Sequence, residues 1–348
     1  MKEIRNIIAL YDQLKEAGTA CALATVVSVE GSSYRRIGAR LLVGADGRYT
    51  GGISGGCLEG DALRRAQRAI HQGQPSKRVY DTLDGDDREI GIGLGCNGRI
   101  EVLFVPLDFA DTDNQVEVLR GYTAIRRPVI LTQTVSAPAG QALDGCLREV
   151  PAGVVDLRYG RSTVVPHTDE QGRAWERLYE RLRPELHLIV VGDNYDILPL
   201  VTTCRHLGWR ISVVGTRRKF TAELSAVADD LYDYAQATSL SVDAFTAVAC
   251  MSHDFYRDQE MVRVFLPQRP RYLGLLGPRK RTVKMDAELR AEGFDLLGYE
   301  RLYSPIGLDI GAETPEEISV SVVAEIISVF RDRPGAPLKE KAGTIHER

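Results

Sequence analysis

The sequence predicts an α/β protein in which an α+β domain is followed by a Rossmann-like, doubly wound parallel sheet. In the second half, short apolar runs alternate with helical patterns, which is typical of strand–helix repeats. In the first half, strands are separated by hairpin turns and glycine-dense loops. We place the domains at residues 1–184 and 185–332, with a flexible charged tail at 333–348.

The first half begins with an amphipathic helical pattern over residues 1–18 and a Val-rich strand at Cys21–Val29. Asp46-Gly47 predicts a two-residue hairpin turn. The strand at 99–106 carries apolar side chains on both faces, which indicates burial on both sides. The remaining predicted elements are a helix at 113–124, strands at 78–83, 129–135, 153–157 and 162–165, and a helix at 170–182.

A glycine-rich stretch at Thr50–Asp61 organises this half of the chain. It contains Gly51, Gly52, Gly55 and Gly56, which let the backbone turn tightly and approach a ligand. An amphipathic helix follows and ends at Gly73, so Cys57 is expected at a helix N-terminus. Unpaired N–H groups and the helix dipole there favour a thiolate or a bound anion, although the charge of Glu59 partly offsets this.

Two further segments resemble ligand-binding loops. Residues 31–40 combine glycines, serine hydroxyls and guanidinium groups, which suit phosphate or carboxylate recognition; a solvated basic turn is the alternative. The candidate residues are Ser32, Ser33, Arg35, Arg36 and Arg40. Residues 91–98 again place a cysteine, Cys96, among glycines.

The second half is predicted to have strands at 187–191, 210–214, 231–234, 244–251 and 272–276. The phosphate-binding turn of a Rossmann fold should follow the first of them, but Asn194 replaces the glycine that would approach a pyrophosphate and Asp193 would repel it. Gly215 replaces the acid that would hold a ribose, and a cationic run at 216–219 follows. An inert Rossmann scaffold and a phosphate ligand both remain open.

Polar residues also follow the later strands of this sheet. Ligands of open α/β sheets collect beyond the carboxyl ends of the strands, so His253, Arg279 and Arg281 are candidates for ligand contact. The last helix has a clear start, with Thr314 as N-cap, Pro315 at the first position and Glu317 completing a capping box.

The overall composition excludes several classes of function. The chain has 348 residues with 44 basic and 48 acidic side chains, which leaves no electrostatic signature of nucleic-acid or membrane-surface binding. No apolar run approaches the length of a bilayer span, and we expect a cytoplasmic protein.

The six cysteines contain no C-x-x-C pair. We interpret Cys21, Cys146, Cys204 and Cys250 as small apolar side chains of the interior.

Taken together, these motifs resemble the XdhC/CoxI family, the accessory factors of xanthine dehydrogenase and related molybdenum hydroxylases. The resemblance rests on six segments, namely 31–40, 55–59, 95–99, 252–254, 275–280 and 305–318. Asn194, Gly215 and Asn97 depart from the pattern. Asn194 and Gly215 weaken an assignment of NAD(P) binding, and Asn97, in place of a glycine, makes the Cys96 loop stiffer.

The resemblance implies an accessory factor that binds molybdenum cofactor (molybdopterin), protects it while a cofactor sulfurase installs its terminal sulfur, and then delivers it to a xanthine dehydrogenase-type hydroxylase. Self-association is implied as well. We expect the three arginines of residues 31–40 and the Gly55-Gly56-Cys57 backbone to hold the phosphate, with Cys57 and Cys96 as molybdenum contacts. The other expected cofactor contacts are Ser32, Ser33, Glu59, His253, Arg279 and Arg281. The ligand is expected in a hollow shared by the two domains.

Two other functions remain open at this stage. One is an NAD(P)-dependent oxidoreductase that uses the C-terminal sheet. The other is a docking module that binds the hydroxylase without holding cofactor.

Overall fold

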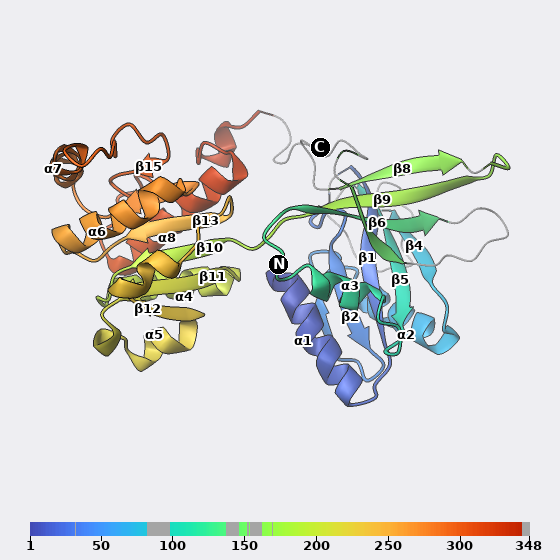
Figure 1. The fold of residues 1–348 in the computed structure, drawn as a ribbon. Helices are drawn as coiled ribbons and strands as arrows, with labels where there is room; N and C mark the ends of the chain where they lie inside the picture. Colours follow the sequence, from blue (N-terminus) through green and yellow to red (C-terminus); the bar gives the residue numbers. More distant parts are fainter. Residues whose placement is uncertain are drawn as a thin grey trace. The chain divides into compact units, whose positions relative to one another are not determined.

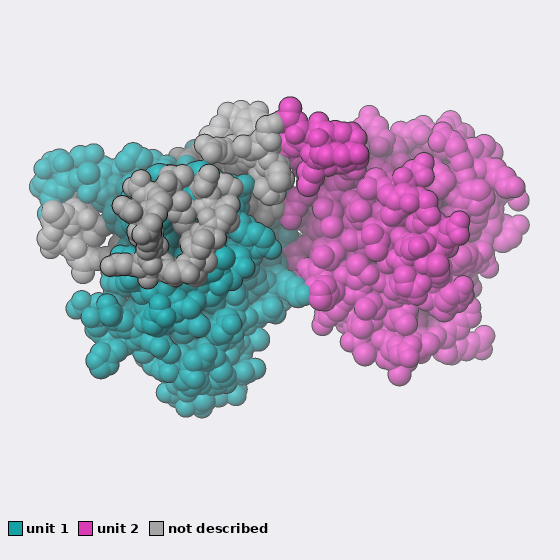
Figure 2. All heavy atoms as spheres, turned by 180° about the vertical axis from the view of Figure 1, so that it is seen from behind, with its two compact units in different colours: residues 1–184, 346–348 teal, residues 185–345 magenta. Residues whose placement is uncertain are grey.

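The computed structural model describes residues 1–31, 33–81, 98–136, 146–151, 153, 162–168 and 170–342. The chain forms two compact units, which we call unit 1, chiefly Met1–Pro184, and unit 2, Glu185–Ile345 (Figure 2). Each unit has its own sheets and core, and each is described by itself.

Unit 1 contains two antiparallel sheets (Figure 1). The first has the strand order β3-β2-β1-β5-β4 and the second the order β7-β6-β9-β8. The elements are α1 (Lys2–Glu16), β1 (Cys21–Gly31), β2 (Arg40–Gly44), β3 (Tyr49–Gly51), α2 (Glu59–Gln72), β4 (Ser76–Asp81), β5 (Gly98–Leu107), α3 (Gln115–Gly121), β6 (Val129–Ser136), β7 (Leu147–Val150), β8 (Ser162–Thr168) and β9 (Ala174–Leu182).

Both faces of the first sheet are covered, because successive side chains of a strand point to opposite sides. Ala22, Ala24 and Val26 of β1 pack with the buried alanines of α2 in one core cluster. Cys21 and Leu23 pack with α1 and α3 in another. The same alternation holds along β5, which confirms the prediction that this strand is buried on both sides.

The predicted helix at 170–182 is wrong, because Ala174–Leu182 is strand β9. Its Glu, Arg and Leu residues favour a helix locally, but propensity is a weak prior that tertiary pairing overrides. Strand β9 is paired on both edges, with β6 and with β8. Its Leu178 joins Val27, Leu103 and Val105 of the first sheet in a shared core cluster. The predicted strand at 153–157 and the turns at 84–87, 144–145 and 159–160 lie outside the described residues.

Unit 2 is a parallel sheet of order β12-β11-β10-β13-β14-β15 with helices on both faces (Figure 1). Every strand pair is parallel, and the order matches that of a Rossmann sheet. The elements are β10 (His187–Val191), α4 (Ile197–Leu207), β11 (Arg210–Gly215), η2 (Arg217–Lys219), α5 (Ala222–Val227), β12 (Asp230–Asp233), η3 (Tyr234–Ser239), β13 (Thr246–Cys250), α6 (Phe255–Phe265), η4 (Leu266–Gln268), β14 (Tyr272–Leu275), α7 (Arg279–Arg290), β15 (Leu302–Tyr303), α8 (Pro315–Arg331) and η5 (Leu338–Glu340).

The central strand β10 divides two cores. Leu188 and Val190 pack toward α4 and α8, whereas Ile189 and Val191 pack toward α6 and α7. Helix α8 begins as predicted: the Thr314 hydroxyl accepts from the Glu317 N–H, and the Glu317 carboxylate accepts from the Thr314 N–H. Among the described helices, none has both the length and the apolar character that a bilayer span requires.

Candidate functional site

Two loops of unit 1 lie side by side. One, residues 33–39, joins β1 to β2; the other, residues 52–58, joins β3 to α2. The Gly52 N–H donates to the Arg40 carbonyl at 2.8 Å. The ring of Tyr34 packs against Gly55, where an added Cβ would lie only 3.4 Å from the ring. The structure therefore brings together the two loops that the sequence singled out separately, and we call them the paired loops.

The glycine-rich loop has buried side chains on one side and is exposed to solvent on the other. Ile53 and Leu58 are buried in the core cluster beneath α2. Between them Gly56 has φ of +114°, a conformation that favours glycine, and Cys57 is exposed. The helix begins at Glu59 with Leu58 as N-cap, so Cys57 lies one residue before the cap. The thiol is therefore presented to solvent by an ordered loop.

Ser54 and Glu59 hold this loop in shape. The Ser54 hydroxyl accepts from the N–H groups of Gly56 and Leu58, and it donates to the Glu59 carboxylate, which also accepts from the Ser54 N–H. Burial alone would raise the pKa of Glu59, but these hydrogen bonds from Ser54 lower it below its usual value. Glu59 thus stabilises the loop as a carboxylate instead of pointing toward a ligand.

The arginines of the other loop divide into two kinds. Arg40 is buried, and its guanidinium forms a bidentate ion pair with Glu180 of β9, with Nη1–Oε1 at 3.1 Å and Nη2–Oε2 at 2.5 Å. Arg35 is ion-paired with Glu3 of α1. Arg36 is exposed, and Ser33 is half-buried. Within the described part of the chain, Arg36 is therefore the arginine of this loop best placed to meet an anion. Ser32 and Cys96 lie outside the described residues.

The other described cysteines are not exposed as Cys57 is. Cys21, Cys204 and Cys250 are buried, in agreement with the prediction that they are interior side chains, and Cys146 is half-buried. Burial raises the pKa of Cys21 to about 12, and it also raises the pKa values of Cys204 and Cys250. These three thiols stay protonated and apolar at neutral pH. No metal-binding cluster of three or more His, Cys, Asp or Glu side chains occurs among the residues that the structure describes.

In unit 2, side chains bridge the crevice where a Rossmann fold binds its ligand. This crevice lies beyond the carboxyl ends of β10 and β13, at which the strand order reverses. Asn194 Nδ2 donates to the Ser252 carbonyl at 3.0 Å, and His253 Nε2 lies 2.6 Å from Asp196 Oδ2. His253 adopts a left-handed conformation with φ of +59°. The two loops that would hold a pyrophosphate are instead hydrogen-bonded to each other.

The turn after β10 is also satisfied internally. Asp193 accepts from the Thr216 N–H at 2.8 Å and from Lys219 Nζ at 3.0 Å. Burial would raise the pKa of Asp193, but these bonds lower it below its usual value. A Cβ at Gly215 would approach the Cβ of Asp193 and the ring of Phe220, each at 2.9 Å. The turn that should accept a ribose is therefore filled by the protein's own side chains.

The two remaining candidates of unit 2, Arg281 and Arg279, differ in their ion pairing and their exposure. Arg281 pairs with Asp258, a carboxylate that is 1% exposed, at 2.7 Å, and it also donates to the Leu276 carbonyl. Asp258 additionally accepts from the Ser252 hydroxyl at 2.6 Å. Arg279 is exposed at the first position of α7. Arg281 thus supports the β13–α6 loop, and Arg279 is accessible to solvent.

Comparison with known proteins identifies the family of this chain. The model of the XdhC and CoxI family matches residues 14–81, and the model of the XdhC Rossmann domain matches residues 188–326. A relative from Bacillus subtilis (strain 168), named as a probable subunit of xanthine dehydrogenase, is 32% identical over 336 residues, which cover 92% of this chain and 97% of the relative. The chain belongs to the XdhC/CoxI family.

Two further likenesses extend over almost the whole chain. The molybdenum cofactor insertion chaperone PaoD of Escherichia coli (strain K12) is 25% identical over 341 residues, covering 93% of this chain and 88% of that protein. The crystal structure of a xanthine dehydrogenase from Bacillus halodurans superposes with a TM-score of 0.72 at 29% identity, covering 95% of this chain and 98% of that one.

Three residues that shape the paired loops of this XdhC/CoxI chain were not predicted from the sequence. Tyr34 is 76% exposed beside Gly55, and a large aromatic side chain between two glycines was the available signal. Glu3 and Glu180 neutralise Arg35 and Arg40. Their distance along the chain from the arginines left no local signal for either pair.

Proposed function

We propose that this chain binds molybdenum cofactor and delivers it to a xanthine dehydrogenase-type molybdenum hydroxylase. The observation that carries the proposal is the pair of adjacent loops in unit 1, which present an exposed thiol, an aromatic ring and a guanidinium group on one domain. The relatives support it, since one is named for molybdenum cofactor insertion and another for xanthine dehydrogenase.

The chemistry of these groups fits the parts of the cofactor. Thiolates are soft ligands that suit the molybdenum end, so Cys57 is assigned to it. The ring of Tyr34 offers a flat surface for stacking on the pterin. Arg36 and the backbone N–H groups near Gly55 and Cys57 would meet the terminal phosphate. Cys96 is retained as a second proposed molybdenum contact on its motif alone.

The proposed role includes the sulfuration of the cofactor. The chain holds the cofactor while a separate cofactor sulfurase installs the terminal sulfur, and then transfers it to the apo-hydroxylase. The scattered cysteines without a C-x-x-C pair are consistent with work in the reducing cytoplasm.

Cofactor content tests the proposal directly. The chain, co-expressed with cofactor biosynthesis and purified without oxygen, is expected to carry molybdenum and pterin in equal amounts. Mixing it with apo-hydroxylase should restore hydroxylase activity. Capture of the apo-hydroxylase by a chain that carries neither metal nor pterin would favour a docking module instead.

Nicotinamide dinucleotides are expected to leave this protein unchanged. The pyrophosphate crevice is bridged by Asn194 and His253, and the ribose position is filled around Gly215. A ligand that binds the folded state raises the melting temperature, so we expect no shift with millimolar NAD or NADP. A saturable shift with either dinucleotide would favour the oxidoreductase alternative.

A further inference from the structure

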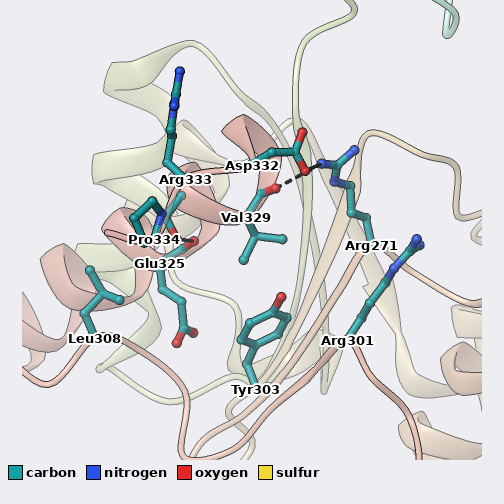
Figure 3. A pocket seen from close by; sticks show the side chains of 10 residues that line it. Arg271, Arg301, Tyr303, Leu308, Glu325, Val329, Asp332, Arg333 and Pro334 are labelled. Carbon is teal, nitrogen blue, oxygen red and sulfur yellow. Dashed lines mark hydrogen bonds and ion pairs between the residues drawn. The ribbon is translucent and has the colours of Figure 1, made fainter. Parts of the chain in front are cut away.

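A cavity of about 620 Å³ opens in unit 2 at the amino ends of β14 and β15 (Figure 3). Arg271 immediately precedes β14, and Arg301 immediately precedes the neighbouring strand β15. The opposite wall is the end of α8 and the segment after it. The lining residues there are Glu325, Ser328, Val329, Asp332, Arg333 and Pro334. The cavity therefore lies at the amino ends of the parallel strands, whereas the Rossmann crevice lies beyond their carboxyl ends.

The floor of this cavity is rigid. The Tyr303 ring stacks on the buried Tyr272 ring, with centroids 4.4 Å apart and planes 15° from parallel. The Tyr272 hydroxyl and the Gly307 N–H both donate to Glu325 Oε2, at 2.5 and 2.9 Å. In Figure 3 the Tyr303 hydroxyl points toward the middle of the cavity. These contacts fix Tyr303 and Glu325 before any ligand arrives.

The charges around the cavity are unevenly compensated. Arg271 Nη2 donates to the Asp332 carboxylate at 2.6 Å and to the Val329 carbonyl at 3.0 Å, so it neutralises the end of α8. Arg301 is exposed, and it forms no ion pair with any residue that the structure describes. Its guanidinium lies on the same side of the cavity as that of Arg271 (Figure 3). Arg301 thus supplies a positive charge that no ion pair with a described residue neutralises, in a cavity whose wall also carries the Glu325 carboxylate.

The Tyr303 hydroxyl is a second donor available to a ligand. It makes no hydrogen bond within the described residues, whereas the Tyr272 hydroxyl beneath it is already used. Burial and the nearby Glu325 raise the pKa of Tyr303 above its usual value, so the hydroxyl keeps its proton at neutral pH. A phenol in this state donates a hydrogen bond to an acceptor in the cavity.

We propose that this cavity binds a small organic oxyanion, a phosphate monoester or a carboxylate, through Arg301 and the Tyr303 hydroxyl. A guanidinium recognises both anions through forked, charge-assisted hydrogen bonds. Leu308, Val329 and Pro334 give the organic part of the ligand an apolar surface. The volume falls within the roughly 300–1,000 Å³ of small-molecule sites. The inference uses only unit 2 and does not depend on the proposed cofactor site in unit 1.

Phenyl phosphate, benzoate and inorganic phosphate are suitable probes of the full-length chain, each titrated by calorimetry at constant ionic strength against a chloride blank. Phenyl phosphate and benzoate compare the two anions on one apolar group, and inorganic phosphate measures binding without that group. We expect saturable binding of at least one aromatic anion. Arg301→Gln is expected to weaken it about tenfold or more, and Tyr303→Phe severalfold, since it removes the hydroxyl and keeps the ring stack.

Arg218→Gln is the matched control. Arg218 is an exposed arginine of unit 2 in the cationic run after β11, which is next to the edge strand β12, whereas the cavity lies at β14 and β15. It should bind the probes as the wild type does, and all variants should melt at the wild-type temperature without ligand. The proposal is overturned by wild-type protein that binds none of the three anions. It is equally overturned if Arg301→Gln and Tyr303→Phe bind like wild type, or if Arg218→Gln is the variant that loses binding.

Discussion

Replacing Glu180 with alanine is expected to destabilise unit 1 by about 3–5 kcal/mol, because the substitution leaves the Arg40 guanidinium buried without its partner. The Arg40 side chain is 4% exposed and the Glu180 side chain is 13% exposed. Burial alone would lower the pKa of Arg40, but Glu180 and Glu3 raise it, so the group stays charged in the fold. Arg40 also donates to the Gly38 carbonyl at the end of the 33–39 loop. Loss of the pair should therefore loosen that loop as well.

Hydrogen exchange measured on peptides from β1 and β2 reports the opening free energy of unit 1 separately from that of unit 2. Glu176→Ala is the matched control on the same strand, since its side chain is 46% exposed and 4.0 Å from Lys77. It should change stability by less than about 0.5 kcal/mol. The double variant Arg40→Met/Glu180→Leu should recover much of the loss, because it removes both charges. Unchanged protection in Glu180→Ala would show that the ion pair does not stabilise unit 1.

Cys57→Ala is expected to lower the molybdenum carried by the purified protein at least fivefold while leaving its folding intact. The thiol is exposed on a loop whose shape depends on Ser54, Glu59 and the buried Ile53, and the side chain of Cys57 contributes none of these contacts. The substitution therefore removes the proposed soft ligand without removing loop structure. Metal analysis and pterin fluorescence of the anaerobic protein measure the effect, with circular dichroism as the folding check.

Cys146→Ala is the control, because Cys146 is also partly exposed and lies elsewhere in unit 1. It should keep the wild-type metal content. Tyr34→Ala should lower the pterin content and Tyr34→Phe should retain it, since phenylalanine preserves the stacking surface. Wild-type metal content in Cys57→Ala would remove this residue from the site, and equal loss in Cys146→Ala would mean that the metal is not held at the paired loops.

Features set by neighbouring residues in the chain were predictable from the sequence. The capping box of α8 needs only Thr314 and Glu317, three residues apart. The hairpin around Asp46-Gly47 and the buried strands of unit 2 are likewise local patterns, and the structure contains them. The predicted two-residue turn is one residue too short, because Val43 pairs with Tyr49 and the Gly44 N–H donates to the Arg48 carbonyl, which leaves residues 45–47 in the turn. Strand β15 was not predicted because it has only two residues and no apolar run of its own.

Features that depend on distant pairing were not predictable. Strand β9 looks helical until β6 and β8 pair with it. The loops at 33–39 and 52–58 were each identified, but their proximity follows from the pairing of β2 with β3. Arg40 looked like a phosphate ligand because no local pattern indicated that Glu180 would face it. The charge of a side chain is visible in a sequence, whereas its partner is a property of the fold.

The crowding around Gly215 restricts how this Rossmann domain can evolve. The carboxylate that holds a ribose in other Rossmann domains cannot be introduced at 215 by a single substitution, because it would collide with Asp193 and Phe220. Asp193 in turn cannot be removed without releasing Lys219 and the Thr216 N–H. A carboxylate at 215 therefore needs coordinated replacements at its neighbours. The effect of a substitution at 215 is thus expected to depend on the residue at 193, so the two positions are epistatic.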